Sequence, residues 1–148
     1  MIRKNLKVTV CAFILGLLIT VSTAVAYAAT IYSNWGYYGP INGYSYKNRS
    51  SLMISNGWLN TGADVYNQAV DNIPTGYMGA KARLYNSSNQ LIDYSSWHYN
   101  SSACNNFGVI ISKNNYSHGY YYGKGQTAAY NGNGYTIYNT FQTPNLYF

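Results

Sequence analysis

The sequence predicts an all-β fold: a small single-domain antiparallel sandwich of about eight short strands, with a small barrel as the alternative. Short runs rich in aromatic and β-branched residues alternate with clusters of Asn, Gly, Ser and Pro, a pattern typical of strands joined by tight turns. Asn-Gly pairs, which accept positive φ cheaply, mark turns at positions 42–43, 56–57, 131–132 and 133–134. No amphipathic helical segment of useful length follows residue 28.

Taken in chain order, the first predicted strands are 30–38, 43–54 and 62–70, each bounded by residues typical of turns. The stretch 63–70 is also the best candidate for a helix, but its Val and Tyr residues fit a strand equally well. The clearest hairpin is 77–99, whose first strand alternates apolar residues with amphipathic ones; the apolar positions are Met78, Ala80, Ala82 and Leu84.

Three further strands are predicted at 107–112, 119–130 and 134–142. The segment 119–125, "GYYYGKG", lacks the spacing and the Ser/Thr of a phosphate-binding loop, and we interpret it as a strand with a bend. The chain closes on Tyr147 and Phe148, two large apolar residues at a terminus that would otherwise fray. We therefore expect the tail to dock onto the sheet.

Residues 1–28 have the features of a secretory signal peptide. Arg3, Lys4 and Lys7 precede an apolar run, and Ala26-Tyr27-Ala28 satisfies the small-residue rule for cleavage. We expect cleavage after Ala28, with cleavage after Ala26 and an uncleaved membrane anchor as alternatives. Residues 29–148 are then predicted to form one all-β domain that is secreted, extracellular and without a stable membrane anchor.

The charge and the cysteine content limit the classes of partner that the protein is expected to bind. Residues 29–148 carry six basic and three acidic side chains, a dispersed formal charge of +3 that does not predict nucleic-acid binding. Salt-sensitive attraction to an anionic bacterial surface stays open. Cys104 is the one cysteine after residue 28, so no intramolecular disulfide is expected; we favour a buried thiol over an intermolecular bridge.

The composition argues against an enzyme. The chain has no Glu and three Asp, whereas a glycosidase needs two carboxyl groups flanking the bond that it cleaves. His98, His118 and Cys104 match no compact zinc spacing and no specific nucleophile–base pattern. We expect no catalytic residue, no metal site and no cofactor.

Eighteen tyrosines follow residue 28, and they favour two roles. Most are expected to pack their rings in a half-buried sheet. Others are expected to form a recognition surface, because Tyr with Asn, Ser and Gly is the composition of surfaces that bind by stacking and adaptable hydrogen bonds. Since Tyr120 and Tyr122 share a face that Tyr121 opposes, at least one of them faces away from the core. The candidate ligand-binding residues are Trp35, Tyr37, Tyr38, Trp58, Trp97, Tyr120, Tyr121 and Tyr122.

Two stretches carry a resemblance to known proteins. "SNWGYYGPINGYSYKNRSS" followed by "IPTGYMGAKARLYNSSNQLI" resembles uncharacterised small secreted proteins of Gram-positive bacteria, over most of residues 29–148. The opening on Trp35, Gly39 and Tyr44-Ser45-Tyr46 is similar to bacteriocins of the lactococcin 972 type, small all-β proteins that act on the envelope of competing cells. The present chain is longer than those bacteriocins, and the family offers no catalytic residue to carry over.

Together these observations predict a secreted, non-enzymatic binding protein that acts at a bacterial cell envelope through an aromatic and Asn-rich surface. Its partner is expected to be a cell-wall polysaccharide or an envelope protein, and the resemblance implies bacteriocin-like antagonism. The alternative is a structural protein of an extracellular matrix that assembles into homo-oligomers through Tyr-rich edge strands.

Overall fold

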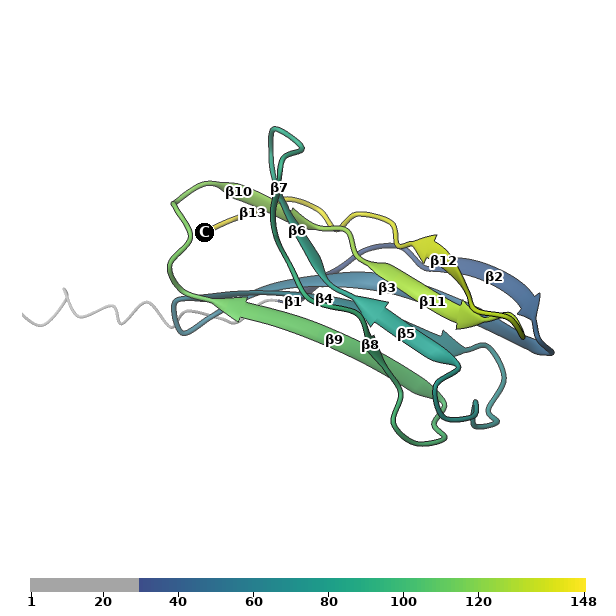
Figure 1. Ribbon diagram of the computed structural model, residues 1–148. Coiled ribbons are helices and arrows are strands. Elements are labelled where there is room, and N and C mark those ends of the chain that lie inside the picture. Colours follow the sequence, from purple (N-terminus) through teal and green to yellow (C-terminus); the bar gives the residue numbers. More distant parts are fainter. Residues whose placement is uncertain (1–29) are drawn as a thin grey trace, which may run out of the picture.

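The computed structural model describes residues 30–148, and its regular structure consists of strands (Figure 1). The predicted signal peptide lies outside the described residues. Within them there is no helix, and hence none that could span a membrane. The strands are β1 (Thr30–Tyr32), β2 (Gly36–Ile41), β3 (Tyr44–Ser55), β4 (Trp58–Asn67), β5 (Met78–Lys81), β6 (Arg83–Asn86), β7 (Leu91–Tyr94), β8 (His98–Tyr99), β9 (Asn106–Lys113), β10 (Tyr120–Gly123), β11 (Gln126–Tyr130), β12 (Tyr135–Asn139) and β13 (Leu146–Tyr147).

The strands form two layers. One layer is a five-stranded sheet in the order β1-β3-β4-β9, with β2 pairing with β3 beside β1. The other layer consists of two four-stranded sheets, β12-β11-β5-β8 and β13-β10-β6-β7. Only Ala82 separates β5 from β6, and only Lys124 and Gly125 separate β10 from β11, so these sheets follow one another along a single broken layer (Figure 1).

This arrangement confirms the predicted antiparallel sandwich, and since the sheets stay open it excludes the alternative of a closed small barrel. Residues 30–148 contain thirteen strands and not eight because four predicted runs are interrupted and the tail adds β13. The run 30–38 gives β1 and β2, the two strands of the 77–99 hairpin give β5 with β6 and β7 with β8, and 119–130 gives β10 and β11. The tail docks as predicted, because β13 pairs with β10.

Of the predicted strand 62–70, residues 62–67 belong to β4, which begins four residues earlier than predicted, at Trp58, and ends at Asn67. The predicted turns at 42–43 and 56–57 connect β2 to β3 and β3 to β4. Asn42 and Asn56 have φ of 47° and 51°, and the glycine that follows each also has positive φ. This is the backbone geometry expected of tight hairpins.

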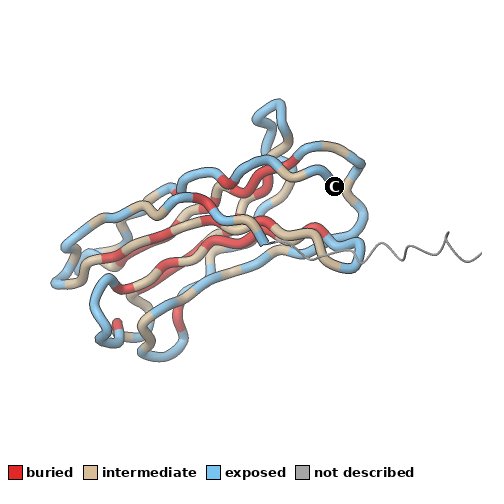
Figure 2. Tube along the Cα trace, turned by 180° about the vertical axis from the view of Figure 1, so that it is seen from behind, coloured by how far each residue is buried: buried red, intermediate tan, exposed pale blue. Residues whose placement is uncertain are grey.

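The core lies between the layers in two clusters, visible in Figure 2 as buried stretches on the central strands. The predicted apolar face of the 77–85 strand is confirmed, because Met78, Ala80, Ala82 and Leu84 are fully buried or nearly so. The first cluster contains Tyr46, Val65, Ile73, Met78 and Ala129. The second contains Leu52, Leu59, Leu84 and Tyr121.

The Gly-Lys-Gly segment at 123–125 marks the break in the second layer, and here that layer is in close contact with the first. A Cβ on Gly125 would overlap the Ala63 side chain, and one on Gly123 would overlap the Thr61 hydroxyl. The Gly125 N–H donates to Ser50 Oγ at 2.8 Å. Residues 119–125 are therefore a strand with a bend, as predicted, and the glycines are required by close packing.

The single cysteine after the predicted signal forms no disulfide. Cys104 is half-buried, packs against the first core cluster and pairs its backbone with Ile73.

Candidate functional site

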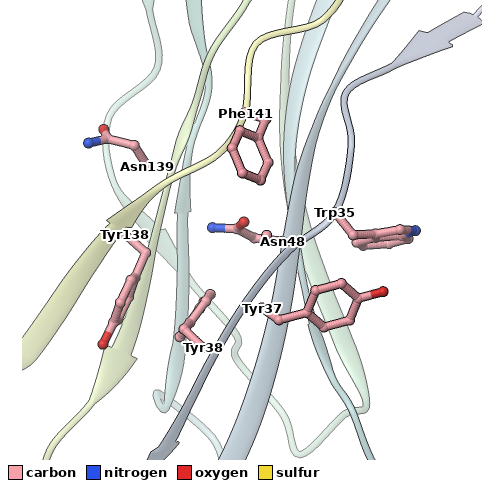
Figure 3. Close-up of a pocket in the computed structure, with 8 residues that line it drawn as sticks. Trp35, Tyr37, Tyr38, Asn48, Tyr138, Asn139 and Phe141 are labelled. Atoms are coloured by element: carbon pink, nitrogen blue, oxygen red, sulfur yellow. The ribbon is translucent and has the colours of Figure 1, made fainter.

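The two layers leave a groove along one open side of the sandwich. Its borders are β2 and β12, each an edge strand that pairs with a single neighbour, β3 and β11 respectively. The groove has a volume of about 440 Å³. The residues that line it are Trp35, Gly36, Tyr37, Tyr38, Asn48, Tyr138, Asn139 and Phe141 (Figure 3).

Tyr38 and Tyr138, which line the groove, belong to a stack of three tyrosines. The Tyr38 ring lies parallel to Tyr138, with 3.9 Å between ring centroids, and also stacks on Tyr46 at 5.4 Å. The Tyr38 hydroxyl shares a hydrogen bond of 3.0 Å with Thr127 Oγ1. Burial raises the pKa of Tyr38 well above its ordinary value, and it raises the pKa of Tyr46 to about 12. Both hydroxyl groups therefore stay protonated and uncharged at neutral pH.

Asn48 lies at the floor of the groove and is 1% exposed. Its Nδ2 donates to Thr127 Oγ1 at 2.7 Å, whereas its Oδ1 is buried without a hydrogen-bond partner. The other buried asparagines in residues 30–148 are satisfied: Asn67 Oδ1 accepts from the Ala69 N–H, and Asn100 Oδ1 accepts from the Met78 N–H. Leaving a buried acceptor unpaired costs about 1–3 kcal/mol.

Gly36 and Phe141 lie near this oxygen. Gly36 lies directly over it, since a Cβ added at Gly36 would stand 2.6 Å from Asn48 Oδ1. The same Cβ position is 3.8 Å from the ring of Phe141, which is 57% exposed. Figure 3 shows the Asn48 amide in the gap between β2 and β12, with Phe141 and Tyr38 on either side of it.

The chemistry of the groove follows from these parts. Exposed aromatic rings offer apolar faces for stacking, and Asn48 Oδ1 offers an acceptor that lacks a donor. Asn139 adds an exposed amide at the opposite border. A polar ligand with both hydroxyl donors and an apolar ring face, such as a sugar, complements this combination.

Trp35 and Tyr37 lie on the other side of β2, where their rings point away from Tyr138 (Figure 3). There Trp35 packs edge-on against Tyr66, with 5.2 Å between ring centroids. Lys47 and Arg49 from β3 lie over the Trp35 ring at 4.9 Å and 4.4 Å from its centroid. Through Trp35 the groove thus borders an aromatic and cationic surface on the other side of β2.

Two of the three acidic side chains, those of Asp64 and Asp93, have structural partners. Burial raises the pKa of the Asp64 carboxyl, and Arg49, whose Nε lies 3.8 Å from Asp64 Oδ2, opposes that rise. Burial would also raise the pKa of Asp93, but hydrogen bonds from Lys113, Tyr116 and the Tyr94 backbone outweigh burial and lower it. Asp64 and Asp93 lie in different sheets, on β4 and β7.

The remaining candidates for chemistry are not assembled into a site. His98 Nε2 contacts Ser96 Oγ, and His118 Nδ1 contacts the Phe148 carbonyl oxygen. In the part of the chain that the structure describes, no three His, Cys, Asp or Glu side chains are grouped so as to hold a metal ion.

The sequence-predicted binding residues fall into three groups. Trp35, Tyr37 and Tyr38 come together at the groove. Trp58, Trp97 and Tyr120 lie elsewhere on the surface: Trp58 begins β4, Trp97 stacks on Tyr99, and Tyr120 packs edge-on against Tyr147.

Tyr121 and Tyr122 are buried, which takes them out of the recognition surface. Tyr121 is 5% exposed within the second core cluster, and its hydroxyl donates to the Ser117 carbonyl. Tyr122 stacks on Tyr85 at 5.2 Å, and its hydroxyl donates to Asn89 Oδ1. Of the three consecutive tyrosines, Tyr120 is the one that faces solvent, in line with the expectation that at least one must.

Sequence reasoning missed the residues that complete the groove. Apart from Gly36, which directly follows Trp35, these are Asn48, Tyr138, Asn139 and Phe141. They come from β3, from β12 and from the segment after β12, so no local spacing connects them with Trp35. The alternation in 134–142 could have placed Tyr138 on the same face as Thr136, but nothing local indicates that β12 borders β2.

No protein-family model matches the chain, and a search of curated proteins found no match.

Proposed function

We propose that this protein is a secreted, non-enzymatic glycan-binding protein that acts at a bacterial cell envelope, with bacteriocin-like antagonism as the specific form of that activity. The observation that carries the proposal is the unpaired Asn48 Oδ1 at the floor of an aromatic groove. A sugar hydroxyl that donates to this oxygen removes the cost of a buried unsatisfied acceptor, while exposed rings beside it stack on the sugar. The resemblance to envelope-active bacteriocins supports the same class of target.

Retention of the purified protein on isolated Gram-positive cell walls tests this proposal. Phe141→Ala removes an exposed groove ring, and Tyr94→Ala is a matched control on β7, because both side chains are 57% exposed. We expect Phe141→Ala to weaken retention about tenfold, the loss of one stacking contact of about 1.4 kcal/mol, and Tyr94→Ala to leave retention unchanged. Equal retention of both variants, or none by the parent protein, would contradict the proposal.

Self-assembly into a matrix is the second candidate, and β9 favours it. This eight-residue strand pairs with β4 on one side and has no partner strand on its other side among residues 30–148. Ile110, near its middle, is 64% exposed. A free edge with an exposed apolar side chain is a template for strand pairing between copies. A molecular mass that rises with concentration, and returns to the monomer value in Ile110→Lys, would favour this function over glycan binding by a monomer.

A further inference from the structure

A pair of cations lies next to the groove, on the outer side of β2 and β3. Lys47 Nζ is 4.9 Å from the Trp35 ring centroid and 5.9 Å from that of Tyr66. The Arg49 guanidinium is held between two rings, 3.9 Å from the Tyr32 centroid and 4.4 Å from the Trp35 centroid. Stacking on aromatic faces restricts the rotamers of both side chains, so the two charges are positioned before any ligand arrives.

The positive charge of Lys47 and Arg49 exceeds the negative charge of the carboxylates near them. Among residues 30–148 the ion pairs are Arg49 with Asp64 and Lys113 with Asp93, so Lys47 has no carboxylate within ion-pair distance. The Arg49 pair is long, at 3.8 Å, and Arg49 Nε is buried without a hydrogen-bond partner. The surface formed by Lys47, Arg49 and Asp64 therefore carries a net positive charge.

Trp35 connects this surface to the groove, since it lines the groove and its ring contacts both cations. Figure 3 shows Trp35 and Tyr37 on the side of β2 opposite Tyr138 and Phe141. A glycan that stacks on Phe141 and crosses the β2 edge would come next to Trp35 and Lys47. One chain can then contact the neutral acceptor site and the cationic surface together.

We infer that the preferred ligand of the groove is an anionic glycan, whose carboxylate or phosphate group binds at Lys47 and Arg49. This inference rests on the proposed glycan-binding function and names the class of glycan. Sugar rings occupy the groove at Asn48 and Phe141, and the anionic substituent lies over Trp35. Charge-assisted hydrogen bonds from a Lys or Arg to an anion are about twice as strong as neutral ones, so the charged substituent discriminates between otherwise similar polymers.

Two matched pairs of polymers test the inference. Polygalacturonate and its methyl-esterified form differ in carboxylate charge, and Gram-positive walls before and after acid removal of phosphodiester-linked polymers differ in phosphate charge. The variant is Lys47→Gln. Lys81→Gln is the control, because Lys81 lies on β5 in the other layer and also sits over a ring, 4.6 Å from the Tyr94 centroid. Affinities are measured at low and at physiological salt.

We expect the anionic member of at least one pair to bind about tenfold more tightly than its neutral partner, and Lys47→Gln to remove most of that preference. Lys81→Gln should keep it. Whether carboxylate or phosphate is preferred follows from the pair that shows the difference. Equal binding of charged and neutral polymers, or the same effect of both substitutions, would overturn the inference while leaving glycan binding intact. If the parent protein bound none of the four materials, the proposed function would be overturned as well.

Discussion

At the residue scale, tyrosine is exposed at one position and buried at the next two. Tyr120 is exposed, Tyr121 fills the second core cluster, and Tyr122 is buried against Tyr85. Alternation along a strand predicts that Tyr121 points away from its two neighbours, and it does. Which of the two faces is covered depends on whether another segment lies over it, and for Tyr122 that segment includes Asn89 of the β6–β7 loop.

Tyr121 and Tyr120 should therefore respond differently to truncation. Tyr121→Ala would leave a cavity in the core and an unpaired Ser117 carbonyl, so we expect the free energy of unfolding to fall by about 3 kcal/mol or more. Tyr120→Ala should change it by less than about 1 kcal/mol, because that ring lies on the surface. Urea denaturation measures both values. Similar losses for the two variants would mean that the burial described for Tyr121 is wrong.

The lowered pKa of Asp93 predicts that the stability of the folded protein depends on pH. Its pKa is lower in the folded protein than in the unfolded chain, so the unfolded chain binds the proton more tightly. The stabilisation by Lys113 and Tyr116 is thus complete above the unfolded pKa, near about 4, and is lost as the pH falls through the folded pKa. Asp93→Asn should lower the unfolding free energy at pH 7 by less than about 1 kcal/mol, since Lys113 is exposed to solvent.

Chemical denaturation of the parent protein and of Asp93→Asn, at pH 7 and near pH 2, tests this dependence. The difference between the two proteins should be present at pH 7 and smaller at the acidic pH. A difference that grows on acidification would show that the folded pKa of Asp93 is raised instead.

At the scale of elements, local patterns predict strands well and strand breaks poorly. The hairpin 77–99, the bend within 119–130 and the docked tail follow from alternation, glycine and terminal aromatics, and each is present. The interruption at Ala82 has no comparable signal. There the Ala82 N–H donates to Ser95 Oγ. This side-chain oxygen takes the place of the backbone carbonyl that would accept the bond in a regular strand pairing.

A prediction at this scale concerns the stability of variants at the glycines where the second layer is broken. Gly125→Ala should destabilise the protein by about 2 kcal/mol, because its Cβ would overlap Ala63 and would lie 2.9 Å from the Lys81 carbonyl oxygen. Gly119→Ala is the control, since the nearest atom to its Cβ would be 3.9 Å away. Thermal or urea unfolding distinguishes them. An unchanged stability for Gly125→Ala would mean that the layers do not approach as closely as described.

At the scale of the whole molecule, function depends on pairings that no short stretch of sequence reveals. The groove exists because β2 and β12, which lie about a hundred residues apart in the chain, border the same open side of the sandwich. Composition correctly indicated a fold with exposed aromatic rings, and three of its candidate residues line the groove. The acceptor Asn48 could not be distinguished from other asparagines, because what singles it out is a missing hydrogen bond.

The most direct test of the glycan-binding groove is a titration of isotopically labelled protein with soluble cell-wall glycan fragments, followed by nuclear magnetic resonance. We expect shifts concentrated in residues 35–38 and 138–141 and in the Asn48 side-chain amide, with amides of β7 and β13 unchanged. Saturable shifts in these segments would support the groove as the binding site. Shifts confined to other surfaces, or none at millimolar ligand, would contradict it.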